Sequence, residues 1–526
     1  MPKVLISDQL SDTAVAIFRD RGVEVIFEPD LGKKPDALKA TVKDVDGLAI
    51  RSATKVTADV LDAAGRLRVV GRAGIGVDNV DIPAATAKGV VVMNTPYGNA
   101  ITTAEHAIAL MFALARQIPQ ANESTHAGKW EKSKFMGAEL FGKTLGVIGC
   151  GNIGANVAER AVGLKMRVIA YDPYLSEARA EELGVAKVDL AQLLAKSDVI
   201  TLHTPLTDQT RNILSAEALA QTRPGVFVVN CARGGLVDED ALGDALDSGH
   251  VAGAALDVFA EEPAKSHRLF GHERVVATPH LGASTREAQE NVAIQVAEQM
   301  SEYLLRGAVT NALNMPSITA EEAPRLKPFI ALAEALGAFA GQLTETSVKA
   351  IEVTYAGGVA KLNPRPMTAS AIAGVLRPML GDVNIVNAPV IAKERGVAIA
   401  ETFRDTAENY ESVIRLRIVT ERMDRVVAGA LFGKTPRIVE VNGVEMEAAF
   451  APHMLFVTND DKPGFIGALG RTLGEKGVNI ATFNLGRATP GGDAIALLAV
   501  DDPVAEDVLK EVRALPLVNR AKALAF

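Results

Sequence analysis

Short apolar runs alternate with stretches of helical periodicity along the first 98 residues. Apolar runs bounded by polar or glycine-containing turns predict buried strands, and the amphipathic stretches between them predict helices. The expected strands cover residues 3–7, 23–27, 47–50, 67–71 and 90–93. Strands that alternate with helices are typical of βα units around a parallel sheet, so we expect a small α/β domain here.

The same alternation continues from residue 99 to residue 285, with expected strands at 145–148, 167–171, 199–202, 226–229, 254–256 and 275–277. Ahead of them, the apolar stretch from Thr102 to Arg116 predicts a long buried helix, and we interpret His106 within it as a packed interior histidine. A helix expected over 285–305 is long enough to return the chain to the first domain. We therefore expect a discontinuous first domain, residues 1–98 and 286–314, around a second domain, residues 99–285.

Two further domains are expected after residue 314. Residues 315–452 repeat the mixed α/β pattern, with a helix over 326–343, strands over 348–354 and 412–420, and a hairpin whose turn is Asn442-Gly443. Residues 453–526 have the order strand–helix–strand–strand–helix–strand of a ferredoxin-like unit. Such units typically pair with a copy of themselves, so this pattern also predicts a homo-oligomer.

One turn carries a specific chemical signature. Gly149, Gly151 and Gly154 follow an apolar strand in G-x-G-x-x-G spacing, a helix pattern starts behind them, and the next strand ends in Asp172. In dinucleotide-binding folds these glycines allow a tight turn, the approach of a pyrophosphate, and close packing of helix on strand. The helix N-terminus offers N–H groups to the phosphates, and Asp172 would accept hydrogen bonds from the ribose hydroxyls. The stretch predicts an NAD site, and the alternative is a glycine turn that only packs a helix on a strand.

Composition narrows the class of protein. Of the 526 residues, 48% are hydrophobic and 23% are charged, which allows large buried cores, and the net charge is −9. The sequence has no basic block that would favour nucleic acid, and no apolar run of membrane-spanning length. Its two cysteines, Cys150 and Cys231, form neither a disulfide framework nor a metal-ligand set. We expect a cytoplasmic protein with no metal ion, no nucleic-acid partner and no membrane association.

Three residue types that follow strands of the second domain suit hydride transfer at a secondary alcohol. The fork of an arginine can hold a carboxylate and polarise the reacting oxygen, which suggests Arg233. A histidine can accept and return a proton near neutral pH, which suggests His280. A carboxylate on the second ring nitrogen would fix the tautomer of the histidine and stabilise its charged form. Glu261 and Glu262 are equal candidates for that carboxylate.

An anion site is expected beyond the first sheet. Arg51 and Arg72 each follow a strand of the first domain, and ligands of open α/β sheets bind beyond the carboxyl ends of the strands. The alternative interpretation is that both arginines are solvated loop charges.

At these residues the sequence resembles the D-isomer-specific 2-hydroxyacid dehydrogenases. The matching stretches are residues 71–79 (GRAGIGVDN), 149–154 (GCGNIG), 203–206 (HTPL), 230–235 (NCARGG), 255–259 (ALDVF) with Glu262-Pro263, and 279–285 (PHLGAST). The resemblance implies a Rossmann-type doubly wound NAD domain inserted in a flavodoxin-like substrate domain. It also implies Arg233 as substrate anchor, Glu262 rather than Glu261 as the partner of the histidine, and His280 as acid and base.

The resemblance implies binding residues as well. The implied NAD contacts are Gly149, Gly151, Asn152, Ile153, Gly154, Asp172, Thr204, Cys231, Ala232, Arg233, Asp257, His280, Leu281, Gly282 and Ala283. The implied contacts of the substrate carboxylate and phosphate are Arg51, Ser52, Arg72, Gly74 and Asn99. Two positions depart from the family: Asn152 stands where arginine is common, and Ile75 where threonine is frequent. We expect a weaker side-chain contact with the pyrophosphate at the first and altered packing near the nicotinamide at the second.

The C-terminal half resembles regulatory parts of the long members of this family. Residues 453–526 resemble an ACT domain, in which Asn459, Asp461 and Asn479 are implied to bind L-serine at an interface of two such domains. Residues 315–452 resemble an allosteric substrate-binding insert. Over the whole length the resemblance implies a homotetramer that oxidises 3-phospho-D-glycerate with NAD to 3-phosphooxypyruvate, the first step of serine synthesis. Two alternatives stay open: another D-2-hydroxyacid dehydrogenase or glyoxylate/hydroxypyruvate reductase, and an NAD(H)-sensing protein without catalysis.

Overall fold

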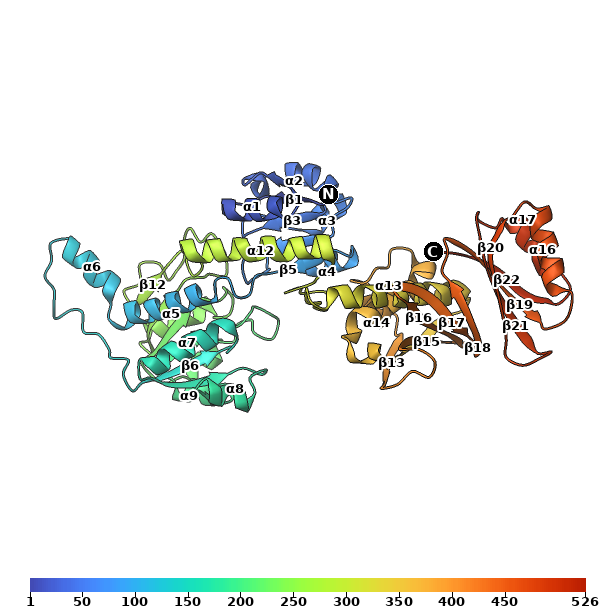
Figure 1. Cartoon of the computed structure of the whole chain (residues 1–526). Coiled ribbons are helices and arrows are strands. Elements are labelled where there is room, and N and C mark those ends of the chain that lie inside the picture. Colours follow the sequence, from blue (N-terminus) through green and yellow to red (C-terminus); the bar gives the residue numbers. More distant parts are fainter.

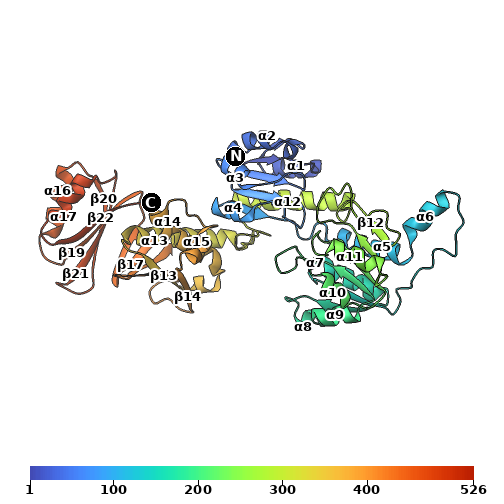
Figure 2. The same ribbon diagram turned by 180° about the vertical axis from the view of Figure 1, so that it is seen from behind.

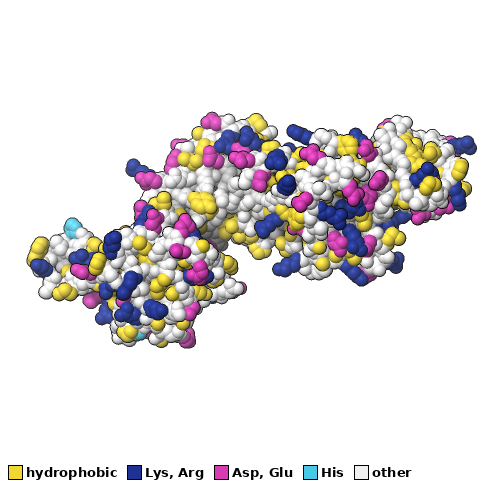
Figure 3. Space-filling model, turned by 60° about the horizontal axis from the view of Figure 1, so that its bottom comes forward, with side chains coloured by type: hydrophobic (Ala, Val, Ile, Leu, Met, Phe, Trp, Pro, Cys, Tyr) yellow, Lys and Arg dark blue, Asp and Glu magenta, His cyan; other side chains and the backbone are white.

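Four β-sheets organise the chain, and the computed structural model describes residues 1–526. The units built on these sheets lie in a row, in which the first unit stands between the second unit and the two C-terminal ones (Figure 1, Figure 2). Positively and negatively charged side chains are interspersed over the face in Figure 3. None of the helices combines the length and the apolar character that crossing a membrane requires.

The first sheet is parallel throughout, with the flavodoxin-like strand order β2-β1-β3-β4-β5. Its strands are β1 (Lys3–Ile6), β2 (Glu24–Phe27), β3 (Gly47–Ile50), β4 (Val69–Arg72) and β5 (Val91–Met93). The helices between them are α1 (Asp12–Asp20), α2 (Pro35–Thr41), α3 (Ala58–Ala63) and α4 (Ile82–Ala87). The five strands predicted from the apolar runs are confirmed, with ends that differ by at most two residues.

Helix α12 (Arg286–Arg306) brings the chain back to the first sheet after the second unit is complete (Figure 1). Val296 and Met300 of this helix pack over Gly71 of β4, where a Cβ atom would lie only 2.2 Å from the Met300 sulfur. The hydroxyl of Thr285 accepts the N–H of Ala288 and caps the first turn. The long helix therefore covers one face of the first sheet, as its predicted length suggests.

The second sheet has seven strands in the order β12-β11-β10-β9-β6-β7-β8, all parallel. Its strands are β6 (Thr144–Ile148), β7 (Arg167–Tyr171), β8 (Ala186–Lys187), β9 (Val199–Leu202), β10 (Val226–Asn230), β11 (Val251–Leu256) and β12 (Val275–Ala277). Its helices are α5 (Ala100–Ala115), α6 (Ile118–His126), α7 (Asn152–Gly163), α8 (Glu177–Glu182), α9 (Leu190–Lys196), α10 (Ala216–Ala220) and α11 (Glu239–Asp247). This is the doubly wound order of dinucleotide-binding folds with one added strand.

The third sheet is mixed, with the order β14-β13-β15-β16-β17-β18 and one parallel pair, β13 with β14. Its strands are β13 (Val348–Gly357), β14 (Ala398–Arg404), β15 (Ser412–Thr420), β16 (Arg425–Phe432), β17 (Thr435–Val441) and β18 (Val444–Ala449). Its helices are α13 (Ala323–Leu343), α14 (Pro364–Leu380) and α15 (Ala388–Glu394). Asn442 and Gly443 have φ of 49° and 82°, as the predicted two-residue hairpin turn requires.

The fourth sheet is antiparallel with the order β20-β21-β19-β22, which is the ferredoxin-like arrangement that the sequence predicts. Its elements are β19 (His453–Asp460), α16 (Phe465–Glu475), β20 (Ile480–Arg487), β21 (Asp493–Val500), α17 (Glu506–Ala514) and β22 (Val518–Ala525). Helix α13 of the third unit anchors it, because the Gln342 amide exchanges two hydrogen bonds of 2.9 Å with the backbone of Ala525.

Candidate active site

The predicted nucleotide and catalytic residues meet at one edge of the second sheet. All its strands are parallel, so their carboxyl ends share that edge. The glycine loop follows β6, Asp172 follows β7, Thr204 follows β9, residues 231–233 follow β10, Asp257 follows β11 and residues 280–283 follow β12. The predicted substrate residues lie beyond the first sheet, with Arg51 and Ser52 after β3, Arg72 and Gly74 at the end of β4, and Asn99 before α5.

The three glycines of the loop face different surroundings. Gly149 has φ of +88°, a backbone conformation that residues other than glycine rarely adopt. A Cβ atom on Gly154 would lie 2.0 Å from the carbonyl oxygen of Gly149, so this position permits close packing of α7 on the loop. A Cβ atom on Gly151 would meet nothing within 4 Å. The space beside Gly151 fits the predicted approach of a pyrophosphate to the N-terminus of α7.

Asp172 is tied to the glycine loop. Its carboxylate accepts the backbone N–H of Cys150 at 2.8 Å through one oxygen and that of Tyr174 at 2.8 Å through the other. A carboxylate oxygen can accept two hydrogen bonds, so each oxygen keeps one free lone pair. Asp172 therefore braces the loop and retains the capacity to bind a pair of ribose hydroxyls.

His280 and Glu262 form a hydrogen-bonded pair in front of the sheet. Nδ1 of His280 donates to Oε2 of Glu262 at 2.7 Å, and Oε1 of Glu262 accepts the N–H of Phe259 at 3.1 Å. Burial alone would raise the pKa of Glu262, but the hydrogen bonds from His280 and Phe259 outweigh it and hold the pKa below its ordinary value. Nε2 of His280 has no protein partner, and Glu261 makes no hydrogen bond to His280. Geometry thus favours Glu262, which sequence composition alone could not separate from Glu261.

Asp257 supports the loop that carries His280 from below. Its fully buried carboxylate accepts the N–H of Leu281 at 2.7 Å and that of Gly282 at 2.8 Å. Nε2 of His106 lies 3.1 Å from the same carboxylate, so the histidine predicted to be interior is partly buried and hydrogen-bonded behind the site. Burial alone would raise the pKa of Asp257, but the hydrogen bonds from His106, Thr278 and Leu281 outweigh this effect and hold the pKa below its ordinary value.

Three arginines, Arg51, Arg72 and Arg233, lie close together beside the His280–Glu262 pair. Arg72 is largely buried, and this burial together with the charges of Arg233 and Arg51 lowers its pKa to about 10. Nε of Arg72 is buried without a partner, and so is Oδ1 of Asn99. A Cβ atom on Gly74 would lie 1.4 Å from Nη1 of Arg72, so only glycine leaves room for this guanidinium. Like charges held together, with the unused donor on Arg72, form a site for an anion.

Two aspartates that the sequence analysis did not single out hold this cluster. The carboxylate of Asp8 accepts the N–H of Arg51 at 2.6 Å and the hydroxyl of Thr54 at 2.7 Å. The carboxylate of Asp78 accepts Nε of Arg233 at 2.7 Å. Asp8 follows the first strand, so its place at a strand end was the signal that could have identified it.

The two departures from the family pattern have local partners. Nδ2 of Asn152 donates to the carbonyl oxygen of Pro96 at 3.2 Å, which links α7 to the loop after β5. The carbonyl oxygen of Ile75 accepts Nδ2 of Asn94 at 2.7 Å. The amide of Asn152 is therefore engaged with the loop after β5.

The three residues of the predicted serine site do not meet within one chain. Asn459 lies in β19 and Asp461 directly follows it, whereas Asn479 precedes β20 at the opposite end of the fourth sheet, where it donates to Asp501 at 2.7 Å. The carboxylate of Asp461 accepts Arg487 at 2.8 Å and the N–H of Gly491 at 2.9 Å. Only a second copy could bring all three side chains to one small ligand.

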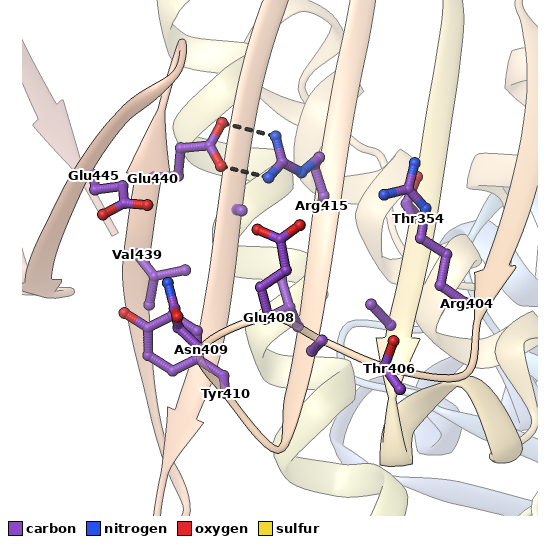
Figure 4. Close-up of a pocket in the computed structure, with 14 residues that line it drawn as sticks. Thr354, Arg404, Thr406, Glu408, Asn409, Tyr410, Arg415, Val439, Glu440 and Glu445 are labelled. Atoms are coloured by element: carbon purple, nitrogen blue, oxygen red, sulfur yellow. Dashed lines mark hydrogen bonds and ion pairs between the residues drawn. The ribbon is translucent and has the colours of Figure 1, made fainter. Parts of the chain in front are cut away.

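A separate hollow lies on the third sheet (Figure 4). It has a volume of about 430 Å³, and Arg415 and Glu440 form a two-point ion pair at its edge, with an Nη1 to Oε1 distance of 2.7 Å. Arg404, Glu408 and Tyr410 line it as well. Most of these charged side chains are exposed to solvent, so the hollow lacks the buried polar groups that distinguish the site above.

Comparison with known proteins places the chain in a class and then in a family. A family model described as "D-isomer specific 2-hydroxyacid dehydrogenase, NAD binding domain" matches residues 108–282, one described as "D-3-phosphoglycerate dehydrogenase intervening domain" matches residues 325–442, and an ACT domain model matches residues 453–517. A solved glyoxylate reductase from Paecilomyes thermophila is 30% identical with a TM-score of 0.56, over 59% of this chain and 98% of that one. Fold and site thus define an NAD-dependent oxidoreductase of the D-2-hydroxyacid dehydrogenase class.

Relatives of full length refine this result. The D-3-phosphoglycerate dehydrogenase of Bacillus subtilis is 40% identical over 100% of this chain and 99% of its own length. That of Methanocaldococcus jannaschii is 42% identical over 99% of both chains. The chain belongs to the D-3-phosphoglycerate dehydrogenase family.

Proposed function

We propose that the chain oxidises 3-phospho-D-glycerate with NAD to 3-phosphooxypyruvate, the first step of L-serine biosynthesis. The observation that supports this choice of substrate is the cluster of Arg51, Arg72 and Arg233 beside the His280–Glu262 pair. A substrate with both a carboxylate and a phosphate matches three positive groups better than lactate or glyoxylate, which carry a single charge. Support also comes from the two full-length relatives, which carry the name of this activity.

The residues divide the chemistry among themselves. Arg233 binds the substrate carboxylate and polarises the oxygen at the reacting carbon, while Arg51 and Arg72 hold the phosphate. Nε2 of His280 removes the hydroxyl proton, and the carboxylate of Glu262 stabilises the resulting imidazolium through Nδ1. The glycine loop and Asp172 would hold NAD, which would accept the hydride from the reacting carbon. In the reverse direction His280 returns the proton to the carbonyl oxygen.

The test follows NADH oxidation in parallel with 3-phosphooxypyruvate, hydroxypyruvate and glyoxylate. We expect the highest kcat/KM with the phosphorylated keto acid. A preference for glyoxylate or hydroxypyruvate would replace the proposal by a reductase of the same class. NADH binding without turnover of any of the three would replace it by an NAD(H)-sensing protein.

We further propose the division of labour between domains. Residues 1–98 and 286–314 bind the substrate, residues 99–285 bind NAD, and residues 315–452 and 453–526 regulate the enzyme, the last by binding L-serine between two copies. The separation of Asn479 from Asn459 and Asp461 within one chain supports a shared serine site. Addition of L-serine to the same assay tests it, since inhibition is expected at millimolar concentrations or below. A cytoplasmic location stays a prediction.

A homotetramer is proposed as the working form. The segment around α6 projects from the second unit (Figure 1), and its side chains Trp130, Met136 and Phe141 are 86%, 81% and 75% exposed. Exposed large apolar side chains on a projecting arm are typical of an interface between subunits. Light scattering coupled to size exclusion measures the mass directly, and a mass of one or two chains would contradict the proposed tetramer.

A further inference from the structure

One ion pair of the site joins residues from different sheets. Asp78 lies in the loop after β4 of the first sheet, and Arg233 follows β10 of the second sheet, 155 residues later in the chain. The carboxylate oxygen Oδ2 of Asp78 accepts Nε of Arg233 at 2.7 Å. The orientation of Arg233 therefore depends on a residue of the opposite unit.

The guanidinium of Arg233 is held on two of its three nitrogens. Nε donates to Asp78, and Nη1 donates to the carbonyl oxygen of Ala232 at 2.6 Å. Nη2 has no protein acceptor and lies against Gly76, where a Cβ atom would be only 1.3 Å away. The contacts fix the plane of the guanidinium and leave one nitrogen for an outside acceptor.

We propose that Asp78 is a positioning residue: by its contact from the first unit to the second, it directs the free Nη2 of Arg233 toward the substrate. The proposal rests on the proposed function of the site. It also explains why a carboxylate is found beside an anion site, where by charge alone it would oppose an anionic substrate. The benefit is orientation, since a polarising group acts most strongly when it is aimed before the reaction begins.

Removal of the Asp78 carboxylate should therefore lower turnover without weakening the binding of the substrate. Without this carboxylate the three arginines attract an anion at least as strongly, so KM should not rise. The guanidinium of Arg233 would lose its fixed plane, so stabilisation of the charge that develops on the reacting oxygen should fall, and with it kcat. An ion pair that only joined two surfaces would change neither value, because exposed pairs contribute little to stability.

The chain offers a matched control. Asp62, in α3 of the same unit, forms an ion pair of 2.7 Å with Lys88, and its side chain is 62% exposed, against 61% for Asp78. The variants Asp78→Ala, Asp78→Glu and Asp62→Ala are compared with the unmodified protein in reduction of 3-phosphooxypyruvate. NADH affinity and thermal midpoint are measured on each variant.

For Asp78→Ala we expect kcat to fall about tenfold with KM unchanged or lower, and with unchanged NADH affinity and thermal midpoint. Asp78→Glu should keep part of the kcat that Asp78→Ala loses, because its carboxylate can still accept Nε of Arg233, and Asp62→Ala should behave as the unmodified protein. A wild-type kcat in Asp78→Ala overturns the inference and leaves the proposed function intact. A parallel loss of NADH affinity or thermal midpoint also overturns it in favour of a structural role. An unmodified protein that reduces no keto acid overturns both.

Discussion

Nδ1 of His280 lies 2.7 Å from Oε2 of Glu262, while Nε2 of the same ring is free of protein partners. The pair is built from two loops: Glu262 also accepts the N–H of Phe259, and Asp257 holds the backbone on the far side of His280 through Leu281. Each group is thus fixed from outside the pair. The imidazole has one nitrogen committed to a carboxylate and the other directed away from it, as an acid–base catalyst requires.

Replacement of His280 by alanine should reduce turnover by about two to four orders of magnitude, the usual contribution of a general acid or base. NADH binding should survive at reduced affinity at most, because most of the implied NAD contacts remain and Asp172 still braces the glycine loop through Cys150. Turnover and NADH fluorescence titration measure the two effects separately. Unchanged turnover in His280→Ala would remove the histidine from the mechanism.

Glu262→Gln tests the partner of the histidine, and Glu261→Gln is its matched control. The amide of a glutamine can still accept a hydrogen bond from Nδ1 but cannot stabilise a charged imidazolium, so kcat should fall about tenfold or more. The pKa of Glu262 is lowered by its hydrogen bonds, so the carboxylate stays charged until the pH falls below the ordinary range of a glutamate. In wild type the loss of this charge should accordingly appear only in strongly acidic solution. Equal losses in both variants would show that the site merely tolerates no change in this loop.

Asp172→Ala should weaken the preference for NAD over NADP. The carboxylate would repel a 2′-phosphate and accept the ribose hydroxyls, and both effects disappear with the side chain. Because Asp172 also accepts the N–H of Cys150, the affinity for both cofactors should fall somewhat. The informative measurement is the ratio of kcat/KM values for NADH and NADPH, which an unrelated disturbance of the loop would leave unchanged.

Arg72 should give the enzyme an alkaline limit. Its pKa is lowered to about 10 by burial and by the charges of Arg233 and Arg51, so its charge is present below that pH and is lost as the pH rises through it. We expect kcat/KM for 3-phosphooxypyruvate to fall above about pH 10, since this parameter reports the free enzyme. Arg72→Lys should move the fall to lower pH, because lysine starts from a lower pKa and the same surroundings depress it. A profile that stays flat to about pH 11 would contradict this role.

Patterns local in sequence predicted most of the fold. Apolar runs gave nearly all strands of the two parallel sheets, because strands buried on both faces are continuously apolar. Helix α14 was missed because residues 366–376 are buried all round and carry no amphipathic period, and β14 was missed because all its residues are exposed.

In the site, too, local patterns predicted some features and not others. Placement after parallel strands predicted that Arg233, Glu262 and His280 lie near one another, since the carboxyl ends of parallel strands share one edge of the sheet. The contact of Asp78 with Arg233 could not be predicted, because it depends on how two domains face each other across 155 residues of chain. Periodicity carries no information about that arrangement.

The glycine loop offers a final prediction, in which two substitutions of the same kind separate folding from binding. Gly151→Ala should keep the thermal midpoint, because a Cβ atom there meets nothing within 4 Å and the φ of −74° suits any residue. It should weaken NADH binding, because the new methyl group would occupy the space expected for the pyrophosphate. Gly154→Ala should lower the thermal midpoint, because its Cβ atom would lie 2.0 Å from the carbonyl oxygen of Gly149 and would push α7 off the loop. Differential scanning fluorimetry with and without NADH measures both effects, and a stable Gly151→Ala variant with wild-type NADH affinity would place the pyrophosphate elsewhere.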